Sequence, residues 1–212
     1  MKLYIIRHGE TVWNTEGRLQ GKADIELNEN GIRLARVTAE AMQDIPFDLA
    51  ITSPLKRARQ TAELIVGDRK IPVIEDERIE EITFGVWEGL CCKKDNFQIP
   101  STDFQDFFAD PFHYQPPEGG ETIPQLLERT GAFYQELIHN QGYQDKTILI
   151  ASHGCSSRAL LYHVEHPGED FWRGHVPANC AVSIVDVQDG KSKLEELDKI
   201  YYNPEDVIDF YD

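Results

Sequence analysis

Short apolar runs alternate with longer amphipathic stretches along most of the chain. Residues 3–6 (LYII) form an unbroken apolar run, which is typical of a strand buried on both faces of a parallel sheet. Later segments show a similar run or a period of two, and an Asp-Gly turn separates the last pair. The pattern predicts strands at residues 3–6, 48–52, 72–74, 146–151, 180–187 and 193–197.

Apolar residues at helical spacing fill the stretches between the predicted strands. In the first stretch, Asn28 is predicted to cap a helix. In the second, Ser53 is the predicted N-cap and Pro54 takes the first helical position. Helices are therefore predicted at residues 28–44, 54–66 and 122–140, and through 158–164 after Ser152-His153-Gly154. This order of elements indicates a layered α/β fold with a mostly parallel sheet.

Residues 93–120 differ from the rest of the chain. They are rich in Phe, Asp and Pro and show no strand pattern. Because 212 residues suit one large domain, we expect an insertion packed over the sheet and not a second domain. Its aromatic residues are expected to form a small core, and the alternative is that some of them line a substrate pocket. They are Phe104, Phe107, Phe108, Phe112 and Tyr114.

The composition narrows the class of partner. With 21 Lys+Arg and 37 Asp+Glu, the formal charge is −16, and such a field repels nucleic acid and anionic lipid. No apolar run approaches the roughly 18 residues of a membrane span, and the first residues lack a signal-peptide pattern. We therefore expect a cytoplasmic protein with no nucleic-acid or membrane partner. Four cysteines without a CxxC pattern suit neither a disulfide framework nor a structural zinc site.

Charged and polar residues follow three of the predicted strands. Arg7 and His8 come after the first strand, Thr52-Ser53 ends another, and His153 follows the strand at 146–151. Ligands of open parallel sheets bind beyond the carboxyl ends of the strands, so these groups converge if the strands are neighbours. Arg57, in the first turn of the next helix, joins them. In an acidic chain this cluster predicts an anion pocket, and a phosphoryl group suits two arginines best.

A carboxyl group near such a pocket could protonate a leaving alkoxide. The segment RIEEITFGVWEG offers three candidates in a glycine-containing loop, which are Glu80, Glu81 and Glu88. Spacing alone leaves the choice among them open.

Five motifs occur in order along the chain: RHGETVWN, TSPLKRARQTA, EITFGVWEG, GGET and ASHG. Together they resemble the histidine phosphatase superfamily, which includes the phosphoglycerate mutases. The resemblance extends from residue 3 to about residue 161. It implies a three-layer α/β/α sandwich, phosphoglycerate mutase-like. It also implies a single histidine-phosphatase domain over residues 1–212, with an insertion or cap at about 93–120.

The resemblance also implies a mechanism. His8 would be the nucleophile that forms a phosphohistidine, and Glu81 would donate a proton to the leaving group and later act as base toward water. No metal or cofactor would be needed, because arginines and histidines supply the positive charge. A small phosphorylated substrate and phosphate as product are the implied ligands. The residues that would hold the phosphoryl group are Arg7, Asn14, Arg57, His153 and Gly154.

Three functions remain open: a phosphomonoesterase, a phosphoglycerate mutase, or a catalytically silent member that binds a phosphorylated ligand. Gln20 stands where mutases of the family usually have threonine, and Lys93 and Lys94 are the basic residues of segment 93–120. These departures favour the phosphatase, and every catalytic position holds a competent residue. The substrate could be a sugar phosphate, a phosphoglycerate or a nucleotide-related monoester. The edge of the part of the site that binds the leaving group is predicted to include Gln20, Gly21, Glu121 and Thr122.

Two other kinds of site have weaker support. The histidines at positions 163, 166 and 175 lack the HExxH spacing of a metal site and are expected to be structural or peripheral. Cys155 stands at a predicted helix N-terminus, which can lower the pKa of a thiol. However, two residues separate it from Arg158, whereas cysteine phosphatases place five there. We expect Cys155 to serve packing.

Overall fold

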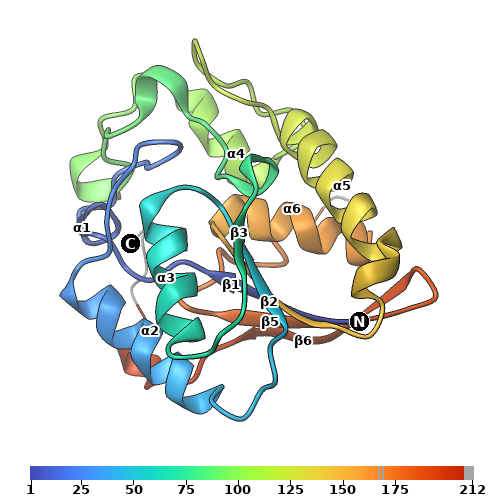
Figure 1. Cartoon of the computed structure of the whole chain (residues 1–212). Coiled ribbons are helices and arrows are strands. Elements are labelled where there is room, and N and C mark those ends of the chain that lie inside the picture. Colours follow the sequence, from blue (N-terminus) through green and yellow to red (C-terminus); the bar gives the residue numbers. More distant parts are fainter. Residues whose placement is uncertain (167, 169, 208–212) are drawn as a thin grey trace.

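The computed structural model describes residues 1–166, 168 and 170–207. In this part of the chain, six strands form one sheet in the order β3-β2-β4-β1-β5-β6 (Figure 1). β1 to β4 run parallel to one another, β5 is antiparallel to β1, and β6 is antiparallel to β5. The predicted mostly parallel sheet is confirmed. The strands are β1 (Lys2–Arg7), β2 (Leu49–Thr52), β3 (Val73–Glu75), β4 (Thr147–Ser152), β5 (Val182–Gln188) and β6 (Lys191–Lys199).

Four longer helices cover the two faces of the sheet. Tyr4 and Ile6 of β1 pack into one apolar core with α2 and α3, and Leu3 and Ile5 pack into another with α5 and α6. Successive strand residues point to opposite faces, so β1 serves both cores and the result is the expected three-layer α/β/α arrangement. The helices are α2 (Glu29–Ala41), α3 (Lys56–Val66), α5 (Ile123–His139) and α6 (Gly154–Val164). None of the described helices is both long enough and apolar enough to cross a membrane.

The predicted helix starts are correct for α2 and wrong for α3. The side chain of Asn28 accepts a hydrogen bond from the Gly31 N–H at 2.7 Å, as an N-cap does. α3 begins at Lys56, and its first N–H donates to the carboxylate of Asp24 at 2.8 Å. Because Asp24 satisfies this helix terminus, Ser53 is not the N-cap and its hydroxyl is available for the site described below.

Two helices of four residues each were not predicted, α1 (Val12–Thr15) and α4 (Asp106–Ala109). α4 lies in segment 93–120, whose aromatic side chains form a cluster as expected, with Phe107 stacked against Phe104 at 5.8 Å between ring centroids. The same apolar cluster includes residues of α5, α6 and the loop after β3, but no described strand residue. The segment therefore packs on the ends of two helices and not on the sheet face.

Candidate active site

Three strand ends meet at one edge of the sheet. β4 lies between β1 and β2, pairing Ser152 with Arg7 and Ala151 with Thr52. The first residue after β1 is anchored there, because the His8 N–H donates to the Ser152 carbonyl at 2.9 Å. The sheet thus brings together the strand ends that the sequence predicted to be neighbours.

His8 is buried at this edge. Its Nδ1 lies 2.7 Å from the Gly9 carbonyl, so Nδ1 carries the proton and Nε2 keeps a lone pair. Burial lowers the pKa of His8 well below its usual value, and the neighbouring Arg57 and Arg7 lower it further. The ring is therefore a neutral imidazole. A Cβ on Gly9 would lie 2.7 Å from the Gly31 carbonyl oxygen, so the glycine is required by a close approach to α2.

Two buried guanidinium groups lie beside His8. Arg57 donates to the carbonyls of Gly21 and Ala23, both at 2.7 Å, and burial lowers its pKa to about 10. It remains a cation at neutral pH. Arg7 donates to the Pro177 carbonyl. These backbone contacts fix both cations at the same place, in a chain whose net charge is negative.

His153 adds a second imidazole. Its ring centroid lies 5.2 Å from that of His8, and its Nε2 lies 2.8 Å from the Ser53 hydroxyl. Burial, followed by the charge of Arg57, lowers the pKa of His153 well below its usual value. Its Nδ1 is buried without a hydrogen-bond partner among the described residues.

The three carboxylates of the loop after β3 have different surroundings. Glu81 accepts from the N–H groups of Cys155 at 3.1 Å and Ser156 at 3.0 Å, at the N-terminus of α6. Glu80 forms an ion pair with Lys22 at 2.8 Å. Glu88 accepts from two backbone N–H groups and from the Thr83 hydroxyl. Of the three, Glu81 alone lines the pocket next to His8.

About 560 Å³ of space that holds no protein atoms, open solvent included, lies in and around that pocket. Gln20 contributes a buried side-chain oxygen that has no partner among the described residues. Thr11 donates twice to the side-chain oxygen of Asn14, which leaves the Asn14 amide NH₂ to meet a ligand.

The predicted site residues that line the pocket are Arg7, His8, Asn14, Gln20, Gly21, Arg57, Glu81 and Gly154. Apolar walls are formed by Leu19, Phe84, Cys92, Phe107, Cys155, Trp172 and Val176.

Two predictions for the substrate edge are wrong. Glu121 and Thr122 are not among the residues that line the pocket. Glu121 instead forms an ion pair with Arg129 at 2.7 Å, and Thr122 caps α5. Polar loop residues take whichever partner the fold brings to them, and here both partners come from α5.

The alternative sites are not supported. The pKa of the Cys155 thiol is raised, not lowered, because burial outweighs the helix N-terminus and the nearby Glu81 carboxylate acts in the same direction. His163 contacts Thr130 at 3.2 Å, and Nε2 of His175 lies 3.0 Å from the Asp198 carboxylate. Both histidines therefore have structural partners.

Two polar residues support the cluster in roles that the sequence did not reveal, since Ser53 was placed at a strand end but predicted as an N-cap and Asn179 was not predicted at all. Ser53 binds His153 as described, and Asn179 donates from its amide to the His8 carbonyl at 3.0 Å. Tyr202 in turn donates to the Asn179 carbonyl at 2.5 Å. Asn179 is 171 positions from His8 in the sequence, so no local signal could have indicated the contact.

Comparison with known proteins defines the class to which this fold and pocket belong. The model of the histidine phosphatase superfamily (branch 1) matches residues 3–199. The chain belongs to this superfamily, as its five motifs indicated.

Individual relatives include phosphatases and mutases. The chain is 31% identical to the "Uncharacterized phosphatase PhoE" of Bacillus subtilis over 91% of each chain. It is 33% identical to a 2,3-bisphosphoglycerate-dependent phosphoglycerate mutase of Cytophaga hutchinsonii, over 77% of this chain and 76% of the mutase. Among solved structures it is similar to Bacillus stearothermophilus YhfR, with a TM-score of 0.84 and 31% identity over 92% of this chain and 95% of that one.

Proposed function

We propose that the protein is a metal-independent phosphomonoesterase that hydrolyses a small phosphate ester through a phosphohistidine on His8. The observation that carries the proposal is the neutral, buried His8 ring, whose Nδ1 binds the Gly9 carbonyl while Nε2 keeps a lone pair beside two arginines. A nucleophilic imidazole needs this protonation state and this fixed orientation.

Two displacements complete the reaction. In the first, Nε2 of His8 forms a bond to phosphorus while the ester P–O bond breaks, and Glu81 gives its proton to the departing oxygen. In the second, the Glu81 carboxylate takes a proton from water, the water oxygen bonds to phosphorus and the P–N bond breaks. Phosphate leaves, and Glu81 again holds a proton. The donor must be protonated when the ester binds.

The positive charge for this transfer comes from the protein. Arg7 and Arg57 are held by backbone carbonyls, and in the proposed reaction their guanidinium groups bind the equatorial phosphoryl oxygens. His153 is fully buried and is not among the residues that line the pocket. In the proposed reaction its unpartnered Nδ1 supplies a further donor, and the Asn14 amide another. Such groups can stabilise the charge that a metal ion stabilises in other phosphatases.

The walls of the pocket favour hydrolysis over mutase chemistry. A mutase must hold a second phosphate-bearing group, which requires further positive charge. Beyond Arg7 and Arg57, the pocket-lining cation is Arg18, and Glu16 already pairs with it at 2.5 Å. Phe107 and Cys92 add apolar surface, and we propose that segment 93–120 acts as a cap over the pocket.

A phosphoglycerate mutase is the second candidate, because a mutase is among the relatives. The test is phosphate release from a panel of monoesters in excess chelator, with interconversion of phosphoglycerates assayed in parallel. The proposal expects release that persists in chelator and disappears in His8→Ala. Interconversion without release would favour the mutase, and silence in both assays from the folded protein would favour a phospho-ligand binder.

A further inference from the structure

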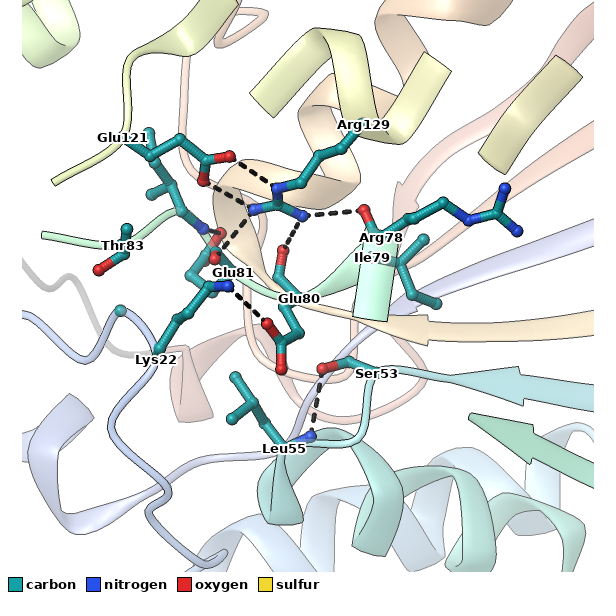
Figure 2. Close-up of polar contacts among 12 residues, drawn as sticks. Lys22, Ser53, Leu55, Arg78, Ile79, Glu80, Glu81, Thr83, Glu121 and Arg129 are labelled. Carbon is teal, nitrogen blue, oxygen red and sulfur yellow. Dashed lines mark hydrogen bonds and ion pairs between the residues drawn. The ribbon is translucent and has the colours of Figure 1, made fainter. Parts of the chain in front are cut away.

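The guanidinium of Arg129, in α5, is directed at the loop that carries Glu81 (Figure 2). Its Nε and Nη2 donate to the two carboxylate oxygens of Glu121 at 2.7 and 2.9 Å. Nη1 donates to the carbonyls of Arg78 and Glu80, both at 2.8 Å, and Nη2 donates to the Glu81 carbonyl at 3.0 Å. These five bonds use all the N–H groups that a guanidinium has.

Glu121, the ion-pair partner of Arg129, also binds the loop that carries Glu81. Its backbone N–H donates to the Thr83 carbonyl at 2.9 Å, so the loop is bound on both sides of Glu81. The side chains of Arg129 and Glu121 are 19% and 13% exposed, so solvent screens their ion pair less than it screens a surface pair. The paired carboxylate also neutralises a charge that would otherwise lie among carbonyl groups.

Two helices therefore share the positioning of Glu81. α5 holds its backbone through Arg129, and the N-terminus of α6 binds its carboxylate through the Cys155 and Ser156 N–H groups. Neither Arg129 nor Glu121 lines the pocket, so neither is expected to contact a bound ligand.

We propose that Arg129 and Glu121 are positioning residues that fix the backbone of Glu81 for proton transfer, an inference that rests on the phosphatase proposed above. A general acid must lie within hydrogen-bond reach of the atom that it protonates. A displacement of about 1 Å can cost a factor of 100 in rate. Without Arg129, three loop carbonyls lose this donor, and the loop is left with the α6 N–H groups at the Glu81 carboxylate and the bond from Glu121 to Thr83.

Arg69 provides a matched control. This arginine also donates to several backbone carbonyls, but at the far ends of α2 and α3, away from the pocket. The carbonyls belong to Met42, Gln43, Ile65 and Val66. Arg69→Met therefore removes a comparable set of bonds without touching the loop of Glu81.

The experiment measures kcat/KM for a series of substituted phenyl phosphates whose leaving groups increase in basicity. Loss of a general acid slows the esters with the most basic leaving groups most. For Arg129→Met we expect about tenfold more loss at the basic end than at the acidic end, with Glu81→Gln showing the same trend more strongly. Glu121→Gln, which keeps the shape of the side chain, should show the trend more weakly, and Arg69→Met should match the wild type. Because the readout is a ratio, a partly unfolded sample does not alter it.

The outcomes separate the two claims. If Glu81→Gln steepens the dependence and neither Arg129→Met nor Glu121→Gln does, the positioning role is wrong and the proposed function stands. An equal steepening in Arg69→Met would also contradict the positioning role, since general destabilisation would then account for it. If Glu81→Gln leaves the dependence unchanged, the proton donor itself is misassigned and both claims fail.

Discussion

Replacing Ser53 by alanine tests how His153 presents its proton. The Ser53 hydroxyl accepts from the Leu55 N–H at 3.3 Å and lies 2.8 Å from Nε2 of His153 (Figure 2 shows the first contact). A hydroxyl has one proton and two lone pairs, and we assign its proton to the contact with Nε2. The imidazole proton is then on Nδ1, which is buried and has no partner among the described residues. That N–H would donate to the phosphoryl group.

The structure sets the size of the effect. Ser53→Ala removes the group that selects this tautomer, so the donor toward the phosphoryl oxygens is lost from part of the population. A hydrogen bond to a charged group contributes about 1.5–3 kcal/mol, and 1.36 kcal/mol corresponds to a factor of ten in rate. Loss of the donor from every molecule would therefore lower kcat by about 10- to 150-fold. Because Ser53→Ala leaves part of the population with the donor, we expect a loss of more than about twofold that stays below this bound, with a smaller change in KM because the contact strengthens in the transition state.

The assay is steady-state hydrolysis of an aryl phosphate, together with urea unfolding to confirm that the variant is folded. Ser157→Ala is the matched control. Ser157 lies in α6, and its hydroxyl is buried like that of Ser53 but has no hydrogen-bond partner among the described residues. The control should keep wild-type kcat. A folded Ser53→Ala variant with kcat within twofold of the wild type would refute the assigned tautomer.

Three further predictions concern the nucleophile, pH and stability. His8→Ala should abolish turnover while the unfolding transition persists; near-wild-type activity would refute the nucleophile. Because the pKa of His153 is lowered by burial, the unfolded state alone takes up its proton below pH 6.5. As the pH is lowered below 6.5, this proton uptake should therefore reduce the unfolding free energy by up to about 1.4 kcal/mol per pH unit. His153→Gln should lessen this slope in urea titrations, and an unchanged slope would contradict the burial argument. Asp198→Asn leaves the buried Arg158 guanidinium without its carboxylate at 2.5 Å, which should cost about 3–5 kcal/mol in urea unfolding; a loss under 1 kcal/mol would contradict it.

The strand ends were predictable because they depend on local chemistry. An unbroken apolar run followed at once by Arg7-His8 indicates a buried strand that stops at a functional edge, and the same pattern precedes His153. That β1, β4 and β2 are neighbours could only be assumed from the sequence. The strand pairing in the structure shows that β4 lies between the other two. Motif order supplied the choice of Arg57 and Glu81, which spacing left open.

The polar contacts between distant loops were not predictable. Ser53 suits an N-cap by local rules, but Asp24, which lies 32 positions before Lys56, binds the first N–H of α3 and leaves the Ser53 hydroxyl for His153. Glu121 was predicted at the pocket edge, yet a bidentate contact with Arg129 turns it away. Such choices depend on which partners the fold brings within reach.

The direction of the pKa shift of Cys155 could not be predicted from the sequence either. Cys155 lies at a helix N-terminus, a place where the pKa of a thiol can fall. In the structure the thiol is buried and near the Glu81 carboxylate, and its pKa rises instead. Burial of a side chain is a property of the whole fold, so sequence position alone could not decide the direction.

The most direct test of the central claim is to trap the phosphoryl group on the enzyme. The protein is mixed with an aryl phosphate in excess chelator, quenched with alkali within the first turnover, and mapped by peptide mass spectrometry. The account predicts an acid-labile phosphoryl group on the peptide that contains His8, formed before phosphate is released and absent from His8→Ala. Phosphate release at the wild-type rate with no phosphorylated peptide, or a phosphoryl group on another residue, would contradict it.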